Sequence, residues 1–146
     1  MFKHILIPTD GSELSVRAAK AGVELAKSLG ARVTGFFAAP APTPVVYGDL
    51  LPVSYMPPDE HAALIEAASK RYLAVIEETA RAAGVRVDTL SVTSEYPAES
   101  IIEAARERGC DLIFMASHGR RGLAALLGGE AHKVLVHSGI PVLVYR

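Results

Sequence analysis

The sequence predicts a doubly wound α/β fold with a five-stranded parallel sheet. Short apolar runs alternate along the chain with longer segments whose apolar residues recur every three or four positions, as on one face of a helix. Two runs, Ile5–Ile7 and Leu112–Met115, are continuously apolar, which is typical of strands buried on both faces. Because strands and helices alternate strictly, right-handed crossovers should join parallel strands and place helices on both faces of the sheet.

The individual elements follow from these patterns in chain order. Five strands are expected, at Ile5–Ile7, Arg32–Ala39, Val85–Val92, Leu112–Met115 and Pro141–Tyr145. Four helices are expected between them, at Ser12–Leu29, Asp59–Ala83, Ala98–Arg108 and Ala131–Ser138, ended by Gly30, Gly84, Gly109 and Gly139. The third strand alternates except for one slip of phase between Val87 and Leu90. Pro97 suits the first turn of the third helix.

One segment, Pro40–Pro58, departs from this alternation. Its nineteen residues include six prolines and show little periodicity. Connections of this length in compact domains are usually functional or mobile. Two interpretations remain open: a flap over the end of the second strand, or an inert insertion.

Composition limits the class of protein. A length of 146 residues is that of one domain, and we expect residues 1–146 to form it. The net charge of −1 argues against general nucleic-acid binding, which usually needs a basic protein. The single cysteine, Cys110, cannot form an intramolecular disulfide. The opening residues lack the apolar run of a signal peptide, and no stretch is long enough to span a membrane, so we expect a cytoplasmic protein.

Ligands of open parallel sheets bind beyond the carboxyl ends of the strands, where the strand order reverses. If the first and fourth strands lie side by side, the segments Pro8–Ser12 and Ala116–Gly122 meet at that point. Farther on, Gly128 and Gly129 precede the last helix, whose first N–H groups could hold phosphate oxygens. The glycines match neither the Walker loop nor the dinucleotide fingerprint.

Three segments carry a resemblance to a known family. Ile5–Ser12, Met115–Gly122 and Lys133–Val144 resemble, in this order, segments of the universal stress protein family, and the likeness covers the whole chain. The resemblance implies a flavodoxin-like, adenine nucleotide alpha hydrolase-like sheet of order 3-2-1-4-5 and a homodimer. In the nucleotide-binding branch it implies bound ATP or AMP, with or without magnesium.

That branch is marked by the pattern G-x2-G-x9-G-S/T, which this chain matches incompletely. Its first glycine falls on Ala116 and its second on Gly119; nine residues onward stand Gly129 and Glu130. Matched backward from the last helix, the final Gly-Ser falls instead on Gly128-Gly129. In both registers the hydroxyl expected at the phosphates is absent.

The resemblance also assigns pocket roles to individual residues. Pro8 and Thr9 would shape a wall, and Asp10 would contact the ribose or the adenine. Ala38 would present backbone groups to the adenine edge, and Met115 an apolar surface. The phosphates would be lined by the following residues: Ser117, His118, Gly119, Arg120, Gly128, Gly129 and Glu130. Read from the residues alone, Asp10 could instead cap the first helix, and Arg120 could be a solvated loop charge.

Three classes of function are compatible with these residues. We place first an ATP- or AMP-binding regulatory module of the stress response. The alternatives are a protein-interaction module with an empty or degraded pocket, and a slow ATPase or phosphotransferase. Asp10 and Glu130 could serve an enzyme, but nothing in the sequence fixes their geometry, so we assign no catalytic residue and no metal ligand. The expected partners are an adenine nucleotide and a second copy bound through the C-terminal strand; no nucleic acid or membrane is expected.

Overall fold

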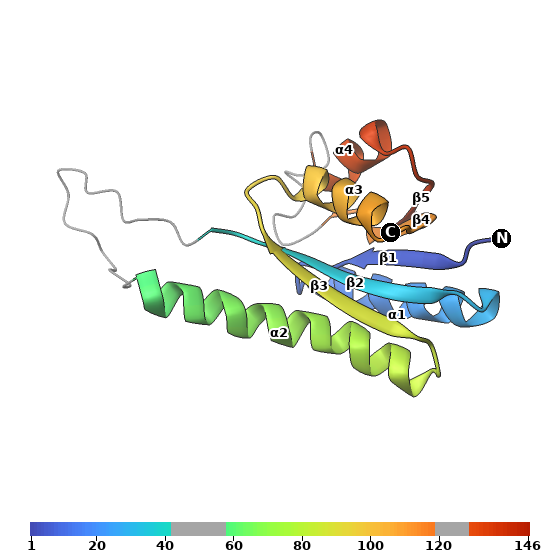
Figure 1. The fold of residues 1–146 in the computed structure, drawn as a ribbon, viewed down its shortest axis with the longest axis horizontal. Coiled ribbons are helices and arrows are strands. Elements are labelled where there is room, and N and C mark those ends of the chain that lie inside the picture. The colour runs from blue at the N-terminus through green and yellow to red at the C-terminus, as the bar shows by residue number, and fades with distance from the viewer. Residues whose placement is uncertain (42–57, 119–128) are drawn as a thin grey trace.

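The computed structural model describes residues 1–41, 58–118 and 129–146 (Figure 1). The elements are β1 (His4–Pro8), α1 (Glu13–Leu29), β2 (Arg32–Ala39), α2 (Pro58–Ala82), β3 (Val87–Thr93), α3 (Pro97–Glu107), β4 (Leu112–Ala116), α4 (Glu130–His137) and β5 (Val142–Tyr145). All strand pairs are parallel, and the sheet order is β3-β2-β1-β4-β5. The predicted fold class and strand order are confirmed.

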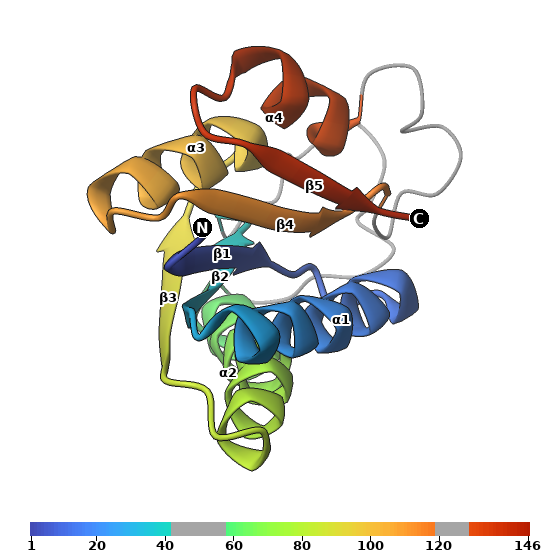
Figure 2. The same ribbon diagram turned by 90° about the vertical axis from the view of Figure 1, so that its right-hand side faces the viewer.

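Two helical layers enclose the sheet. Helices α1 and α2 cover one face, and α3 and α4 cover the other (Figure 2). On β1, Ile5 and Ile7 pack into the α1/α2 core while Leu6 packs into the α3/α4 core, and none of the three is exposed. Burial on both faces explains why these strands read as continuous apolar runs.

The edge strand β3 differs from its prediction at its start. Val85 lies ahead of the strand, where its N–H donates to the Ala80 carbonyl at the end of α2. The slip of phase has a structural cause, because Val87 packs on the α1/α2 core whereas Leu90 and Val92 pack on the α3/α4 core. The strand thus shares its apolar residues between two faces, and neither face is fully covered at the sheet edge.

Helix ends follow the sequence except at the last helix. The glycines after the first three helices, Gly30, Gly84 and Gly109, all have positive φ, as predicted for helix terminators. Helix α4, in contrast, ends at His137 with Ser138 in extended conformation, so Gly139 is not its terminator. The Ser138 hydroxyl there accepts a hydrogen bond from the Ile140 N–H at 3.0 Å.

Among the described helices, none has a stretch of apolar sequence long enough to cross a membrane, the 25-residue α2 included.

A buried histidine lies at the amino end of β1. His4 Nε2 is 2.7 Å from Thr34 Oγ1, and the side chain is 5 % exposed. Burial, helped by the positive charge of Arg32, lowers the pKa of His4 below its ordinary value of 6.5, although Asp111 opposes the shift. The fold therefore holds this imidazole in its neutral form.

We expect the free energy of unfolding to fall as the pH drops below 6.5 toward the lowered pKa of His4. In that pH interval His4 is protonated in the unfolded chain but stays neutral in the folded chain. The contribution of His4 to stability is therefore complete above pH 6.5 and is lost on acidification. Urea unfolding at a series of pH values measures the slope of the free energy of unfolding against pH. The variant His4→Gln should flatten it, whereas His132→Gln, at an exposed position on α4, should not. Equal slopes in the two variants would contradict the role of His4.

Candidate functional site

The chain reverses its winding direction between β1 and β4. Strand β1 lies between β2 and β4, leads into α1 on one face, and is paired with a strand that leads toward α4 on the other face. The carboxyl ends of β1 and β4 therefore meet at the position where open α/β sheets bind ligands (Figure 2). The two loops that the sequence singled out begin at this position.

The side chain of Thr9 holds the loop after β1 together. Its hydroxyl lies 3.1 Å from Ser15 Oγ and accepts a hydrogen bond from the Gly11 N–H at 3.2 Å. Its own N–H donates to the Phe36 carbonyl at 2.8 Å, which ties the loop to β2. Pro8, the last residue of β1, pairs with the same Phe36. Both wall residues thus have structural partners.

Asp10 forms a turn within the loop and is not the cap of α1. Its Oδ1 accepts a hydrogen bond from the Ser12 N–H at 2.9 Å, and Ser12 is the N-cap, with its Oγ accepting from the Ser15 N–H at 3.2 Å. The capping interpretation of Asp10 is therefore wrong, because the Ser12 side chain caps the helix. Asp10 is half-buried at the carboxyl edge of the sheet.

Most of the residues at the carboxyl ends of β2 and β4, next to this loop, pack in the hydrophobic cores. Met115 packs into the α3/α4 core and Ala116 into the α1/α2 core, so neighbouring residues of β4 face opposite layers. Ala38, half-buried near the end of β2, packs on the α3/α4 side. The Ser117 N–H donates to the Tyr145 carbonyl at 2.8 Å and continues the pairing of β4 with β5. Backbone pairing fixes all four positions.

His118 carries an unsatisfied polar atom. Its Nδ1 is buried and has no hydrogen-bond partner among the residues that the structure describes. An unpaired buried polar group costs about 1–3 kcal/mol. The other residues expected in this loop, Gly119, Arg120 and Gly128, lie outside the described residues.

Glu130 connects the beginnings of two helices. Its Oε2 accepts a hydrogen bond from the Ala98 N–H in the first turn of α3 at 2.7 Å, and its Oε1 lies 3.6 Å from Lys133 Nζ. The N-cap of α3, Tyr96, supplies no side-chain cap, and neither does Gly129, the N-cap of α4. Sequence reasoning missed this contact. The absence of a capping side chain before Pro97 is the signal that could have indicated it.

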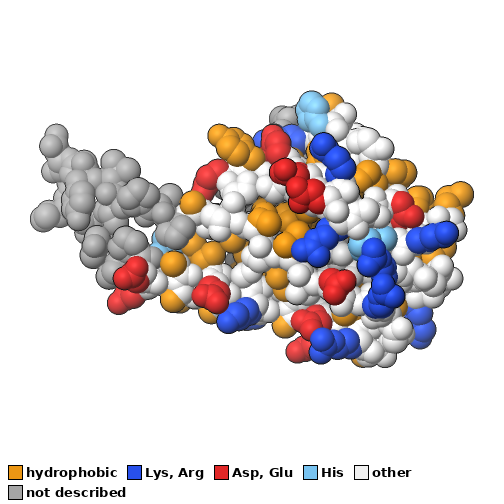
Figure 3. Space-filling model, viewed as in Figure 1, with side chains coloured by type: hydrophobic (Ala, Val, Ile, Leu, Met, Phe, Trp, Pro, Cys, Tyr) orange, Lys and Arg blue, Asp and Glu red, His pale blue; other side chains and the backbone are white. Residues whose placement is uncertain are grey.

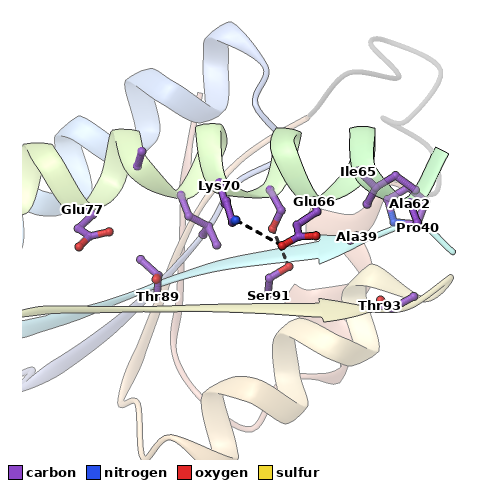
Figure 4. A pocket seen from close by; sticks show the side chains of 13 residues that line it. Ala39, Pro40, Ala62, Ile65, Glu66, Lys70, Glu77, Thr89, Ser91 and Thr93 are labelled. Atoms are coloured by element: carbon purple, nitrogen blue, oxygen red, sulfur yellow. Dashed lines mark hydrogen bonds and ion pairs between the residues drawn. The ribbon is translucent and has the colours of Figure 1, made fainter. Parts of the chain in front are cut away.

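A separate groove of about 560 Å³ lies between α2 and β3 (Figure 4). Two pairs of polar groups in it contact each other: the Ser69 hydroxyl donates to Ser91 Oγ at 2.7 Å, and Glu66 Oε1 lies 3.3 Å from Lys70 Nζ on the exposed side of α2. It lies at the sheet edge, away from the switch between β1 and β4.

The described residues contain neither a cluster of metal-binding side chains nor a thiol with a lowered pKa. Residues 1–41, 58–118 and 129–146 hold no group of three or more His, Cys, Asp or Glu side chains that could bind a metal ion. Burial raises the pKa of the Cys110 thiol to about 11, so this thiol is protonated and unreactive at neutral pH.

Comparison with known proteins fits this arrangement. The sequence model of the universal stress protein family matches residues 1–146. The chain belongs to the universal stress protein family. Universal stress protein YxiE of Bacillus subtilis is 33% identical over 150 residues, which cover 100% of both chains.

Solved structures of universal stress proteins and their relatives share the fold. Protein MJ0577, the subject of a structure-based assignment of biochemical function, superposes with a TM-score of 0.78 at 25% identity, covering 99% of this chain and 95% of that one. A universal stress protein solved in complex with cAMP superposes with a TM-score of 0.69 at 24% identity, covering 99% and 97%.

Proposed function

We propose that residues 1–146 form one domain that binds an adenine nucleotide and acts as a regulatory module of the stress response in the cytoplasm. The observation that carries the proposal is that Asp10 and His118 each stand two residues beyond the carboxyl end of one of the adjacent parallel strands β1 and β4. There, a carboxylate and a buried ring nitrogen lie at the usual ligand position of this fold class. Membership of the family and the cAMP complex of a relative support the same ligand class.

The proposed orientation of the nucleotide follows the strands. The ribose contacts Asp10, and the adenine lies toward the backbone of Ala38 at the end of β2. The phosphates extend from Ser117 and His118 toward the beginning of α4, where helical N–H groups favour negative charge. Both ATP and AMP fit this class of site, with or without magnesium.

The substitution Asp10→Asn tests the ribose contact. Asparagine retains an oxygen that can accept the Ser12 N–H, so the turn and the stability should persist. Loss of the charge should weaken the ribose hydrogen bond by about 1 kcal/mol, which is roughly a fivefold loss of affinity. Calorimetric titration of AMP and ATP into both proteins, with thermal unfolding alongside, measures the two effects.

Asp59→Asn, which removes the same charge from the exposed first turn of α2, is the matched control and should bind as the wild type does. If Asp10→Asn and Asp59→Asn bind nucleotide equally, Asp10 makes no ligand contact. If the wild-type protein binds neither nucleotide, the proposed function itself is wrong.

We also propose that the module is a homodimer joined through β5. In the described sheet this strand pairs only with β4. It is the last strand of the sheet, so its other edge has no neighbouring strand there. Large apolar side chains lie exposed on it and on the helix before it: Leu143 is 38 % exposed, Leu135 is 51 % and Val136 is 60 %. A two-fold axis would pair β5 with its own copy and cover these groups.

The substitution Val144→Lys should convert this dimer to a monomer. A lysine charge at the middle of a buried strand pair would be desolvated without a partner, at a cost of several kcal/mol. Sedimentation velocity measures the mass, and Lys70→Gln, on the far edge of the fold, should leave it unchanged. A dimer that survives Val144→Lys would place the interface elsewhere.

A further inference from the structure

A cleft of about 410 Å³ opens at the amino end of the sheet, opposite to the candidate nucleotide site. It is enclosed by the residues before β1, the turn between α1 and β2, and the turn between α2 and β3. Four of its lining residues are charged, and all four are cationic: Lys3, Lys27, Arg32 and Arg86. Among the described residues that line it, none carries a carboxylate.

Backbone hydrogen bonds fix the positions of these cationic residues. The Arg32 N–H donates to the Lys3 carbonyl at 3.0 Å, and the Val33 N–H donates to the Arg86 carbonyl at 2.8 Å. The Gly30 N–H donates to the Lys27 carbonyl at 3.3 Å. The chain segments that carry the charges are therefore held in one arrangement.

The floor of the cleft is small and apolar. Ala26, Ala31 and Val85 line it and are buried. Gly30 and Gly84 stand beside it, and nothing lies within 4 Å of the position that a side chain would take at either glycine. The space between the cationic side chains is consequently open to a ligand.

None of the four cations in the cleft forms an ion pair within the described part of the chain. The ion pairs found there belong to other cations, Lys70, Arg81 and Lys133. The nearby carboxylate of Asp111 accepts hydrogen bonds from the N–H groups of Lys3 and His4 and keeps its negative charge. Figure 3 shows several Lys and Arg side chains over this end of the molecule, where β2 and β3 begin, with Asp and Glu side chains beside them.

The carboxyl ends of α1 and α2 oppose anion binding, because each contributes about half a unit of negative charge. The four side-chain cations carry more formal charge than these two helix ends contribute. The terminal carbonyls are also engaged, since the Ala31 N–H donates to Ala26 and the Val85 N–H to Ala80.

We propose that this cleft binds a compact multivalent phosphate anion, namely a pyrophosphate or triphosphate group, either free or carried by a nucleotide. Its volume is in the range of small-ligand sites, about 300–1,000 Å³. Lysine and arginine are the side chains that recognise phosphate oxygens, and arginine can do so with two parallel hydrogen bonds. This proposal is independent of the nucleotide site at the other end of the sheet.

Titration of the full chain with inorganic tripolyphosphate and with pyrophosphate tests the proposal. The double variant Lys27→Gln/Arg86→Gln should bind tripolyphosphate roughly tenfold or more weakly. The matched control Lys20→Gln/Arg106→Gln removes the same charge from exposed positions outside the cleft and should change affinity less than about twofold. Raising the ionic strength should weaken binding by the wild type and the control alike.

Amide NMR spectra locate the anion. Tripolyphosphate should shift the amides of Gly30 and Gly84, and ATP should shift the same two if a nucleotide-borne triphosphate also enters. Shifts by ATP without shifts by tripolyphosphate would identify the nucleotide as the source. Absence of tripolyphosphate and ATP binding at the cleft, equal losses in both double variants, or shifts confined to residues 129–131 would each overturn the proposal.

Discussion

Replacing Gly11 with alanine is expected to lower the free energy of unfolding by about 2–5 kcal/mol. Two causes add. Gly11 has a φ of +77°, a conformation that costs an L-residue about 1–2 kcal/mol. A methyl group at this position would also overlap the aromatic ring of Tyr72 on α2.

The Tyr72 ring has little freedom to move aside. It packs edge-to-face against Phe37 with a centroid distance of 5.3 Å, and the guanidinium of Arg71 lies 5.2 Å from its centroid. Moving the ring would break contacts between α2 and β2, which adds the cost of overpacking, about 1–3 kcal/mol. Gly11 also stands between Asp10 and Ser12, so the displaced loop should lose nucleotide affinity as well.

Urea unfolding of the wild type and four variants separates the two causes. Gly30→Ala is the matched control, because Gly30 has a φ of +66° and open space at the side-chain position; it should cost only the strain, about 1–2 kcal/mol. In a Tyr72→Ala background, Gly11→Ala should cost the same smaller amount. If Gly11→Ala costs no more than Gly30→Ala in the wild-type background, the overlap with Tyr72 has no energetic consequence.

Replacing Glu130 with glutamine is expected to raise ATP affinity by about ten- to a hundredfold, or about 1.4–2.8 kcal/mol, while AMP affinity changes little. This expectation rests on the proposed site, in which phosphates reach the beginning of α4. A carboxylate near a triphosphate repels it, and Lys133, at 3.6 Å, offsets only part of that charge. AMP carries fewer phosphate charges and ends farther from this residue.

Glutamine is chosen because its oxygen can still accept the Ala98 N–H, which lies 2.7 Å from the carboxylate. Glu130→Ser removes that cap and should therefore also destabilise α3 by about 0.5–2 kcal/mol. Calorimetry with ATP and AMP, in magnesium and in chelator, measures the affinities. Magnesium should reduce the difference, because a cation between the carboxylate and the phosphates reverses the repulsion. An ATP affinity unchanged under both conditions would mean that Glu130 serves α3 alone.

Much of this protein can be read from short windows of its sequence. Continuous apolar runs identified β1 and β4, and glycine identified the ends of the first three helices. The alternation of elements indicated the parallel sheet, whereas the neighbouring positions of β1 and β4 were expected only from the resemblance to the universal stress protein family. These features depend on residues within a few positions of one another, since strand burial and helix termination are local properties.

The tertiary structure decided what the side chains do. Glu130 meets the N–H of Ala98, which is 32 residues earlier in the chain. Gly11 meets a ring on a different helix, and the cationic cleft draws on residues from Lys3 to Arg86. The cap of α1 proved to be Ser12, because only the loop geometry selects between two oxygen-bearing side chains that stand two positions apart. Such contacts join segments that come together only when the sheet and its helices pack. A sequence pattern predicts which residues face inward, but it does not predict which distant atoms they contact.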